Sequence, residues 1–261
     1  MRVNYHTHTA RCGHATGTED EYIKAAVEAG IKILGFSDHT PYVFHSGHIS
    51  SGYHGVQARM LPEELPAYAD TVRQKQSQYQ GVVDIHLGLE AEYYPAYFDD
   101  LLLRLRDNGI EYLILGQHWS NNEIGQPHNF EPTESKQQLE MYCNEVIDAM
   151  HTGLFTYIAH PDMISFIGDD RFYDTQMRRI CREAVACGIP LEINLLGLGQ
   201  NRSYPTERFW RIAAEEGNQA ILGRDAHSPD AFLDHATVRR ARSFAENLGI
   251  PITENIALRK I

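Results

Sequence analysis

Asp84-Ile85-His86-Leu87-Gly88-Leu89-Glu90 alternates polar or small residues with aliphatic residues along its whole length. This period of two is typical of a β-strand, in which successive side chains point to opposite faces. Ile85, Leu87 and Leu89 are therefore expected to face surrounding helices, and the polar set that ends in Glu90 is expected to face the inside of a barrel. Barrels of alternating strands and helices keep their chemistry at the C-terminal ends of the strands, so Glu90 marks the expected site.

Similar short apolar segments recur along the chain and alternate with longer helical patterns. The expected strands are Val3–His8, Ile33–Ser37, Val83–Glu90, Tyr112–His118, Thr156–His160, Pro190–Asn194 and Ala220–Asp225, with a weak eighth near Pro251–Glu254. The expected helices are 22–29, 63–80, 96–107, 134–151, 174–187, 206–216 and 235–248, the first preceded by a capping box of Thr18 and Glu21. This order is typical of a parallel sheet with helices outside it. We expect a single α/β barrel domain over residues 1–261.

The composition is that of a globular protein. The chain has 261 residues, 43% of them hydrophobic, and a net charge of −12. This acidic balance argues against nucleic-acid and anionic-membrane partners. No apolar run approaches the ~18 residues of a membrane span, and Met1–Asp20 lacks the apolar core of a signal peptide, so a cytoplasmic location is expected. The 4 cysteines show no CxxC spacing and are interpreted as reduced thiols.

Ligand-type side chains end almost every expected strand. The first strand ends in His6-x-His8 and the seventh in Asp225-x-His227, and residues two apart on a strand share a face. The intervening strands finish in or near His39, Glu90, His118 and His160. Each residue alone is more often structural, but together they predict a metal site, because imidazoles and carboxylates are the donors that divalent transition metals accept.

The motifs HTHTARCGHA, SDHTP, LGLEAEY, GQHW, HPD and GRDAH follow one another from His6 to His227. In this order they resemble the motifs of the PHP (polymerase and histidinol phosphatase) superfamily, and within it the chain is most similar to the histidinol-phosphate phosphatases. The resemblance implies a distorted (β/α)7 barrel that encloses two or three divalent ions of zinc, iron or manganese. Arginine at position 224 and glutamine at position 117 depart from the more usual small residues, but neither change removes a ligand.

The resemblance also implies which residues hold each ion. One ion would be held by His6, His8, Glu90 and Asp225; a second by Glu90, His118 and His160; and a third by His14, His39 and His227. The presence of His14 favours three ions over two. A hydroxide bound by the metals near Glu90 and Asp225 would be the nucleophile.

Substrate contacts are expected from side chains outside the ligand set. Arg202 is the leading candidate for the phosphate, because a guanidinium pairs bidentately with phosphate oxygens, and Arg171 and Arg224 are reserves. Asn194 is a further candidate, with a buried hydrogen-bonding role as the alternative. His45 lies in the segment Tyr42–Gly55, which is interpreted either as a cover over the site or as a solvated loop. Asp162 is expected to support a histidine ligand.

These features predict hydrolysis of a small phosphate monoester, with L-histidinol phosphate converted to L-histidinol and phosphate as the reaction that the resemblance implies. One alternative is a phosphoesterase of the same superfamily that acts on a nucleotide, a phosphotyrosyl protein or a phosphodiester. Another is an amidohydrolase-type enzyme, which often uses a bridging lysine where this chain offers Glu90. A third is a non-catalytic metal-binding module. Nothing in the sequence indicates the oligomeric state.

Overall fold

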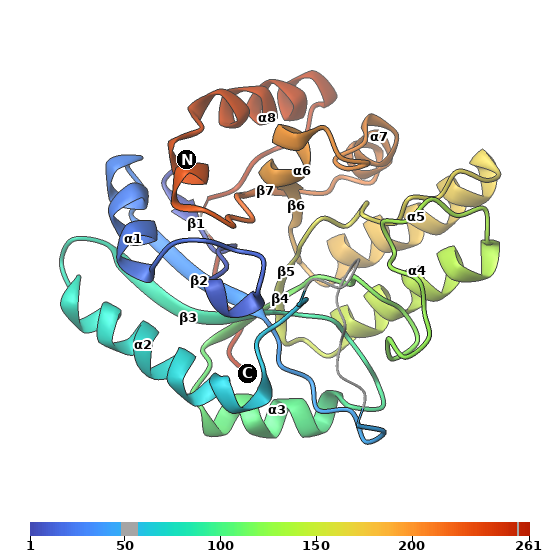
Figure 1. The fold of residues 1–261 in the computed structure, drawn as a ribbon. Helices are drawn as coiled ribbons and strands as arrows, with labels where there is room; N and C mark the ends of the chain where they lie inside the picture. The colour runs from blue at the N-terminus through green and yellow to red at the C-terminus, as the bar shows by residue number, and fades with distance from the viewer. Residues whose placement is uncertain (48–56, 255) are drawn as a thin grey trace.

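Seven parallel strands lie side by side in chain order in the computed structural model, which describes residues 1–47, 57–254 and 256–261 (Figure 1). The strands are β1 (Val3–Asn4), β2 (Ile33–His39), β3 (Asp84–Ala91), β4 (Tyr112–Leu115), β5 (Phe155–Ile158), β6 (Leu191–Asn194) and β7 (Ala220–Gly223). Helices surround them on the outside (Figure 1). This arrangement is the α/β barrel that the sequence predicts.

The first and last strands meet through side chains and one bridge. Thr7 and Ala226 form a parallel β-bridge just beyond the ends of β1 and β7. Asn4 reinforces this seam, since its amide donates to Thr7 Oγ1 at 2.8 Å and accepts from the Arg224 backbone N–H at 2.8 Å. The barrel is thus nearly closed with seven strands. The eighth strand expected near Pro251–Glu254 is wrong, because Ile252 makes only an isolated bridge to Ala220.

The long helices match the expected ones closely. They are α1 (Glu19–Glu28), α2 (Leu65–Gln78), α3 (Phe98–Asp107), α4 (Lys136–His151), α5 (Asp170–Ala186), α7 (Glu207–Glu215) and α8 (His235–Leu248). The capping box of Thr18 and Glu21 is confirmed. The short helix α6 (Leu195–Gln200) was not predicted, because LLGLGQ contains two glycines and is too short to show a helical period. Among the described residues no helix is long and apolar enough to cross a membrane.

The two faces of β3 separate as its alternation predicts. Ile85, Leu87 and Leu89 are buried in the large core between sheet and helices. The inside of the barrel holds a second, smaller core that includes Tyr112. A side chain at Gly88 would place its Cβ 2.2 Å from the Tyr112 ring, so glycine there leaves room for the tyrosine. This inner core fills the barrel below its C-terminal mouth, and the polar residues gather above it.

Several strands end earlier than the sequence predicts. β1 ends at Asn4, β5 at Ile158 and β7 at Gly223, so the ligand-type residues that follow lie in short irregular segments. His160 and Asp225 have positive φ angles of 32° and 50°. The left-handed region is unfavourable for residues with a Cβ and is typical of functional sites. The chain therefore leaves the sheet where these side chains turn inward.

Candidate metal centre

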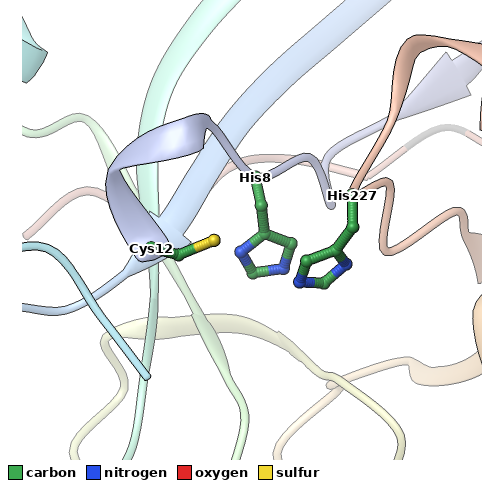
Figure 2. A group of neighbouring side chains, drawn as sticks. All are labelled: His8, Cys12 and His227. Atoms are coloured by element: carbon green, nitrogen blue, oxygen red, sulfur yellow. The ribbon is translucent and has the colours of Figure 1, made fainter. Parts of the chain in front are cut away.

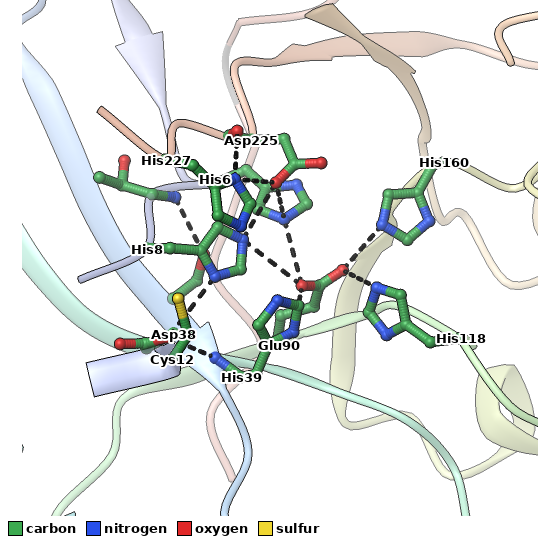
Figure 3. Close-up of polar contacts among 12 residues, drawn as sticks. His6, His8, Cys12, Asp38, His39, Glu90, His118, His160, Asp225 and His227 are labelled. Atoms are coloured by element: carbon green, nitrogen blue, oxygen red, sulfur yellow. Dashed lines mark hydrogen bonds and ion pairs between the residues drawn. The ribbon is translucent and has the colours of Figure 1, made fainter. Parts of the chain in front are cut away.

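The structure brings all nine predicted ligands together at the C-terminal mouth of the barrel. Figure 3 labels these ligands with the exception of His14. They fall into overlapping groups whose donor atoms lie within 4.8 Å of one another. These groups include His6–His8–Glu90, His14–His39–His227, His39–Glu90–His118 and His6–His160–Asp225. The grouping of His14 with His39 and His227 matches the expected third ion. The assignment of particular residues to particular ions stays a prediction.

Glu90 lies at the centre of the cluster and faces different imidazoles with its two oxygens (Figure 3). Oε1 lies 2.9 Å from His160 Nε2 and 3.5 Å from His118 Nε2. Oε2 lies 3.0 Å from His39 Nδ1 and 3.4 Å from His6 Nε2. A buried carboxylate with one oxygen toward each half of a cluster has the geometry of a bridging ligand.

Asp225 faces the other side of the cluster. Its Oδ1 lies 3.1 Å from His8 Nε2 and 3.5 Å from His6 Nε2. Its second oxygen accepts a hydrogen bond from Asn194 Nδ2 at 3.1 Å, so the last residue of β6 helps to orient the carboxylate. Asp225 thus directs one oxygen to the two histidines that follow β1.

Hydrogen bonds on the outer nitrogen fix the orientation of four of the imidazoles. A metal-binding histidine usually donates its other N–H to a carboxylate or carbonyl. In this structure the Nδ1 atoms lie 2.8–3.0 Å from such acceptors: His6 with Glu192, His118 with Glu92, His14 with the Gln57 carbonyl, and His227 with the Asp225 carbonyl. The proton is then on Nδ1, and the Nε2 lone pair of each ring is available to a metal ion.

The inward-facing atoms of the cluster are buried without hydrogen-bond partners among the described residues. They include His6 Nε2, both ring nitrogens of His8, Glu90 Oε2 and His227 Nε2. Most buried polar atoms in folded proteins are hydrogen-bonded, so a group of unsatisfied atoms around one point needs an explanation. Divalent ions would satisfy the Glu90 oxygen and one nitrogen of each of these rings. The donor set of imidazoles and carboxylates therefore fits such ions.

The electrostatics of the cluster favour ionised carboxylates. Burial raises the pKa of Glu90, but His118 and His6 outweigh it and bring that pKa well below its usual range. Burial acts in the same direction on Asp225, and the neighbouring imidazoles also bring its pKa well below the ordinary value. Burial lowers the pKa of His6, while the carboxylates around it, Glu192 foremost, raise it well above 6.5 overall. Both carboxylates are thus charged and able to bind cations, while protons on the imidazoles compete with metal.

Cys12 lies beside the cluster with its sulfur directed toward His8 and His227 (Figure 2). The sulfur and one nitrogen of each histidine lie within 4.8 Å of one another. Burial raises the pKa of the Cys12 thiol well above its usual range, so the thiol is protonated. The interpretation of Cys12 as a reduced thiol is consistent with this position.

A pocket of about 720 Å³ opens above the ligands. Its floor includes His39, His118, His160, Asp225 and His227, and its walls include Gln57, Trp119, His128, Phe130, Met163, Ser165, Leu196, Gln200, Arg202 and Tyr204. No lysine is among the described lining residues. Glu90 stands in the central position where the amidohydrolase alternative often has a bridging lysine, so the site does not support that alternative.

Arg202 is one of the pocket residues, as a phosphate contact should be. Its guanidinium donates to Tyr204 Oη at 3.1 Å and to Gln200 Oε1 at 3.0 Å. These neutral partners orient the side chain without neutralising its charge. The role of Arg202 in phosphate binding stays a prediction.

Three of the expected substrate contacts are absent from the described lining of the pocket. His45 lies outside the pocket, where its exposed imidazole pairs with Asp100 at 3.1 Å. Arg171 is exposed in the first turn of α5 and is also absent from the described pocket lining. Asn194 is fully buried and accepts from the Gly197 backbone N–H, so it caps α6 and supports Asp225 instead of contacting a substrate.

Other expectations have mixed outcomes. Asp162 accepts from the Thr206 hydroxyl and backbone N–H, so in the described part of the chain it holds the loop before α7 instead of a histidine ligand. The Arg224 guanidinium donates to the Ala231 carbonyl and does not line the pocket among the described residues. Of the segment Tyr42–Gly55, residues 48–55 lie outside the described residues.

Two buried carboxylates beside the ligands were not singled out. Glu192 contacts His6, and Glu92 contacts His118. Glu92 follows Glu90 by two positions in LGLEAEY, and Glu192 precedes Asn194 by two in the strand β6. The period of two places each on an inward face, and this signal could have identified both.

Comparison with known proteins identifies the family of the chain. The family model for the PHP domain matches residues 4–195 of the chain. The chain belongs to the PHP domain family. A probable histidinol-phosphatase of Deinococcus radiodurans is 31% identical over 235 residues, which cover 86% of this chain and 85% of the relative.

Solved structures show the same fold for this PHP domain. The histidinol phosphate phosphatase of Lactococcus lactis, complexed with zinc, L-histidinol and phosphate, has a TM-score of 0.73 at 16% identity and covers 100% of this chain and 98% of its own. A putative histidinol phosphatase of Listeria monocytogenes has a TM-score of 0.72 at 18% identity, covering 90% and 99%. At these identities the likeness is evidence for the fold.

Proposed function

We propose that this PHP domain is a metal-dependent phosphatase that hydrolyses L-histidinol phosphate to L-histidinol and phosphate. The observation that carries the proposal is the convergence of nine imidazole and carboxylate donors under a pocket whose wall includes Arg202. The relatives named histidinol-phosphatase support the choice of substrate.

Three divalent ions of zinc, iron or manganese are the proposed cofactor. His6, His8, Glu90 and Asp225 would hold the first, Glu90 with His118 and His160 the second, and His14 with His39 and His227 the third. Bound divalent ions lower the pKa of water toward neutrality and neutralise charge on the phosphate oxygens. The availability of His14, with its Nδ1 proton directed to the Cys12 and Gln57 carbonyls, supports three ions over two.

The residues of the chain bind and orient the phosphate ester. Arg202 binds phosphate oxygens through its guanidinium, which is the side chain best matched to a phosphate group. Glu90 and Asp225 contact the imidazoles of the cluster and would supply its negatively charged donors. The burial of Glu90 and Asp225 strengthens their contacts with the imidazoles, because water screens them less.

The pocket wall suits a leaving alcohol that carries a flat aromatic ring. Trp119, His128 and Phe130 pack against one another, with the ring centroids of Trp119 and His128 4.6 Å apart. Burial, together with nearby positive groups, lowers the pKa of His128 to about 2, so its ring stays neutral. His128 Nδ1 accepts from the Phe130 backbone N–H at 3.2 Å, which leaves the proton on Nε2. A flat heterocycle such as the imidazole of histidinol fits this surface.

A substrate panel tests the proposal. Purified protein loaded separately with zinc, iron and manganese is assayed for phosphate release from histidinol phosphate, p-nitrophenyl phosphate, nucleotides, a phosphotyrosyl peptide and a phosphodiester. We expect kcat/KM for histidinol phosphate to exceed that for the generic aryl phosphate by at least about 100-fold, the value of one or two specific buried contacts. Equal values would reject histidinol phosphate as the substrate. The variants His8→Ala and Asp225→Ala are expected to remain folded and to lose activity, and full activity in both would reject the metal site.

A further inference from the structure

Arg59 is a buried cation between two carboxylates. Its side chain is only 5% exposed, and it donates to Glu123 Oε2 at 2.7 Å and to Glu92 Oε1 at 3.1 Å. Its guanidinium also lies 5.5 Å from the ring centre of Trp119 and 5.6 Å from that of Tyr42. Burial of a charge is costly unless it is paired, so Arg59 and its two carboxylates must keep their present contacts to remain buried.

One nitrogen of the guanidinium, Nη2, is connected to the metal centre through Glu92. The Glu92 oxygen that accepts from Arg59 also accepts from His118 Nδ1, at 2.9 Å. The far side of the His118 ring, Nε2, lies 3.5 Å from Glu90 Oε1. A continuous chain of contacts therefore runs from Arg59 through one carboxylate oxygen to the side of the imidazole that faces the cluster.

The other nitrogen, Nη1, donates to Glu123 in a strained loop next to the pocket. Asn121, Asn122 and Glu123 have successive positive φ angles of 50°, 60° and 68°. Such angles are unfavourable for residues with a Cβ and persist only where surrounding contacts hold them. Glu123 is fixed from two sides, by Arg59 and by the Tyr94 hydroxyl at 2.9 Å. The loop begins directly after Trp119, which lines the pocket.

The residues just before Arg59 contact a second part of the metal centre. The Gln57 carbonyl lies 3.0 Å from His14 Nδ1, and the Gln57 side-chain amide donates to the Arg59 carbonyl at 2.7 Å. The segment 57–59 is thus in contact with His14 directly and with His118 through Glu92. These two histidines come from segments that lie far apart in the sequence.

We propose that Arg59 is a positioning residue for the metal centre: by holding Glu92 it sets the orientation of His118, and by anchoring the segment 57–59 it ties this histidine to His14. This inference rests on the metal-dependent function proposed above. Arg59 itself touches neither the metals nor the substrate. Its role is to hold the Glu92 carboxylate in place at the outer nitrogen of His118.

Removal of the guanidinium has a defined consequence. Without Arg59, Glu92 and Glu123 are two buried carboxylates with no cation between them, and an uncompensated buried charge is strongly unfavourable. Glu92 is then no longer held in its present orientation, and His118 loses its fixed acceptor. Loss of such an outer partner commonly lowers metal affinity about 10–100-fold.

The test compares two variants. Arg59→Met keeps an unbranched apolar stem and removes the charge, and Arg59→Lys keeps the charge and loses the two-pronged geometry of the guanidinium. Arg178→Met is the matched control, because Arg178 pairs with Glu215 and Glu216 at the surface. Metal-free protein is titrated with Co(II), and visible absorption reports the number, affinity and geometry of the bound ions. Urea unfolding of the metal-free variants measures stability separately.

We expect Arg59→Met to bind at least one Co(II) equivalent about 10–100-fold more weakly than the parent, with a changed absorption spectrum, and Arg59→Lys to fall in between. The control is expected to match the parent. If every folded Arg59 variant bound Co(II) with the affinity and the spectrum of the parent, the proposal would be overturned. If Arg59→Met does not fold, Arg59→Lys alone provides the test. A parent that binds no Co(II) would instead refute the proposed function.

Discussion

The outer nitrogen of His6 lies 2.8 Å from Glu192 Oε1, and both side chains are completely buried. The second oxygen of Glu192 accepts from the His160 backbone N–H at 3.1 Å. One carboxylate on β6 therefore holds a histidine that follows β1 and the backbone of a histidine that follows β5. The ligands are fixed by contacts between strands as well as by their own places on the chain.

Glu192→Gln is expected to weaken metal binding. An amide keeps the size of the side chain but places an N–H₂ group toward either the His6 N–H or the His160 N–H, so one acceptor is lost. We expect metal affinity and kcat to fall about 10–100-fold, as measured by metal content after dialysis and by phosphate release. Glu215→Gln, at an exposed position on α7, is the matched control. Unchanged metal content in Glu192→Gln would show that the contact with His6 does not orient the ligand.

Arg202→Ala is expected to weaken phosphate binding. A hydrogen bond to a charged group is worth roughly 1.5–3 kcal/mol, so kcat/KM for histidinol phosphate should fall about 10–100-fold. Arg202→Lys should recover part of the loss, because it restores the charge without the bidentate geometry. Arg171→Ala tests the specificity of the effect, since Arg171 is exposed on α5. Equal losses in Arg171→Ala and Arg202→Ala would contradict the assignment.

Gly116→Ala is expected to displace the central carboxylate. A Cβ at this position would lie 2.0 Å from Glu90 Oε1, closer than nonbonded atoms approach. Glu90 would have to rotate away from His118 and His160, so the metal-dependent activity should fall by more than about 100-fold while overpacking costs about 1–3 kcal/mol of stability. Gly199→Ala is the control, because its Cβ would make only ordinary contact with Thr237 at 3.4 Å. A Gly116→Ala protein with parental activity would show that Glu90 has freedom to move.

Removal of metal is expected to lower stability together with activity. Ligands that bind only the folded state stabilise it by about 2.7 kcal/mol at 100 times Kd. Thermal unfolding measured with chelator and with increasing zinc or manganese should therefore show a Tm that rises with metal concentration. The variant His8→Ala should show a smaller rise. A Tm that is independent of metal in the parent would contradict a site built from buried ligands.

Local periodicity explains what the sequence predicted well. The period of two in β3 placed Leu87 toward the helices and Glu90 toward the centre, and both orientations are confirmed. The pairs His6-x-His8 and Asp225-x-His227 lie on adjoining ends of the sheet because the bridge between Thr7 and Ala226 joins them. The alternation in β3 depends on strand geometry, which is readable from a few consecutive residues, whereas the two pairs lie just beyond the ends of β1 and β7.

Features that depend on the path of a loop were not predictable. The sequence places His45 soon after a strand that ends in His39, but the chain turns so that His45 contacts Asp100 on α3. The period of two predicts that Glu92 lies on an inward face. Its hydrogen bond with Arg59 was not predictable, because no local pattern connects the two residues. Contacts of this kind are set by packing between distant segments and carry no short-range signal.

Glu145 on α4 gives a prediction for the pH dependence of stability. It accepts from the Asn121 backbone N–H at 2.6 Å and from Gln117 Nε2 at 3.1 Å, and burial raises its pKa from 4.5 to about 7. Between these two values the unfolded chain loses this proton before the folded chain does. The contribution of Glu145 to stability therefore falls as pH rises from 4.5 to 7 and is constant above that range.

Glu145→Gln carries no charge at any pH, so its stability relative to the parent should increase over this interval. We expect the difference in free energy of unfolding between variant and parent to shift by on the order of 2 kcal/mol in favour of the variant between pH 5 and pH 8. Urea unfolding at both values measures the shift, and taking the difference cancels the contributions of other groups. Glu140→Gln, exposed on the same helix, is the control. A shift of the opposite sign would mean that the hydrogen bonds from Asn121 and Gln117 stabilise the ionised carboxylate more than burial disfavours it.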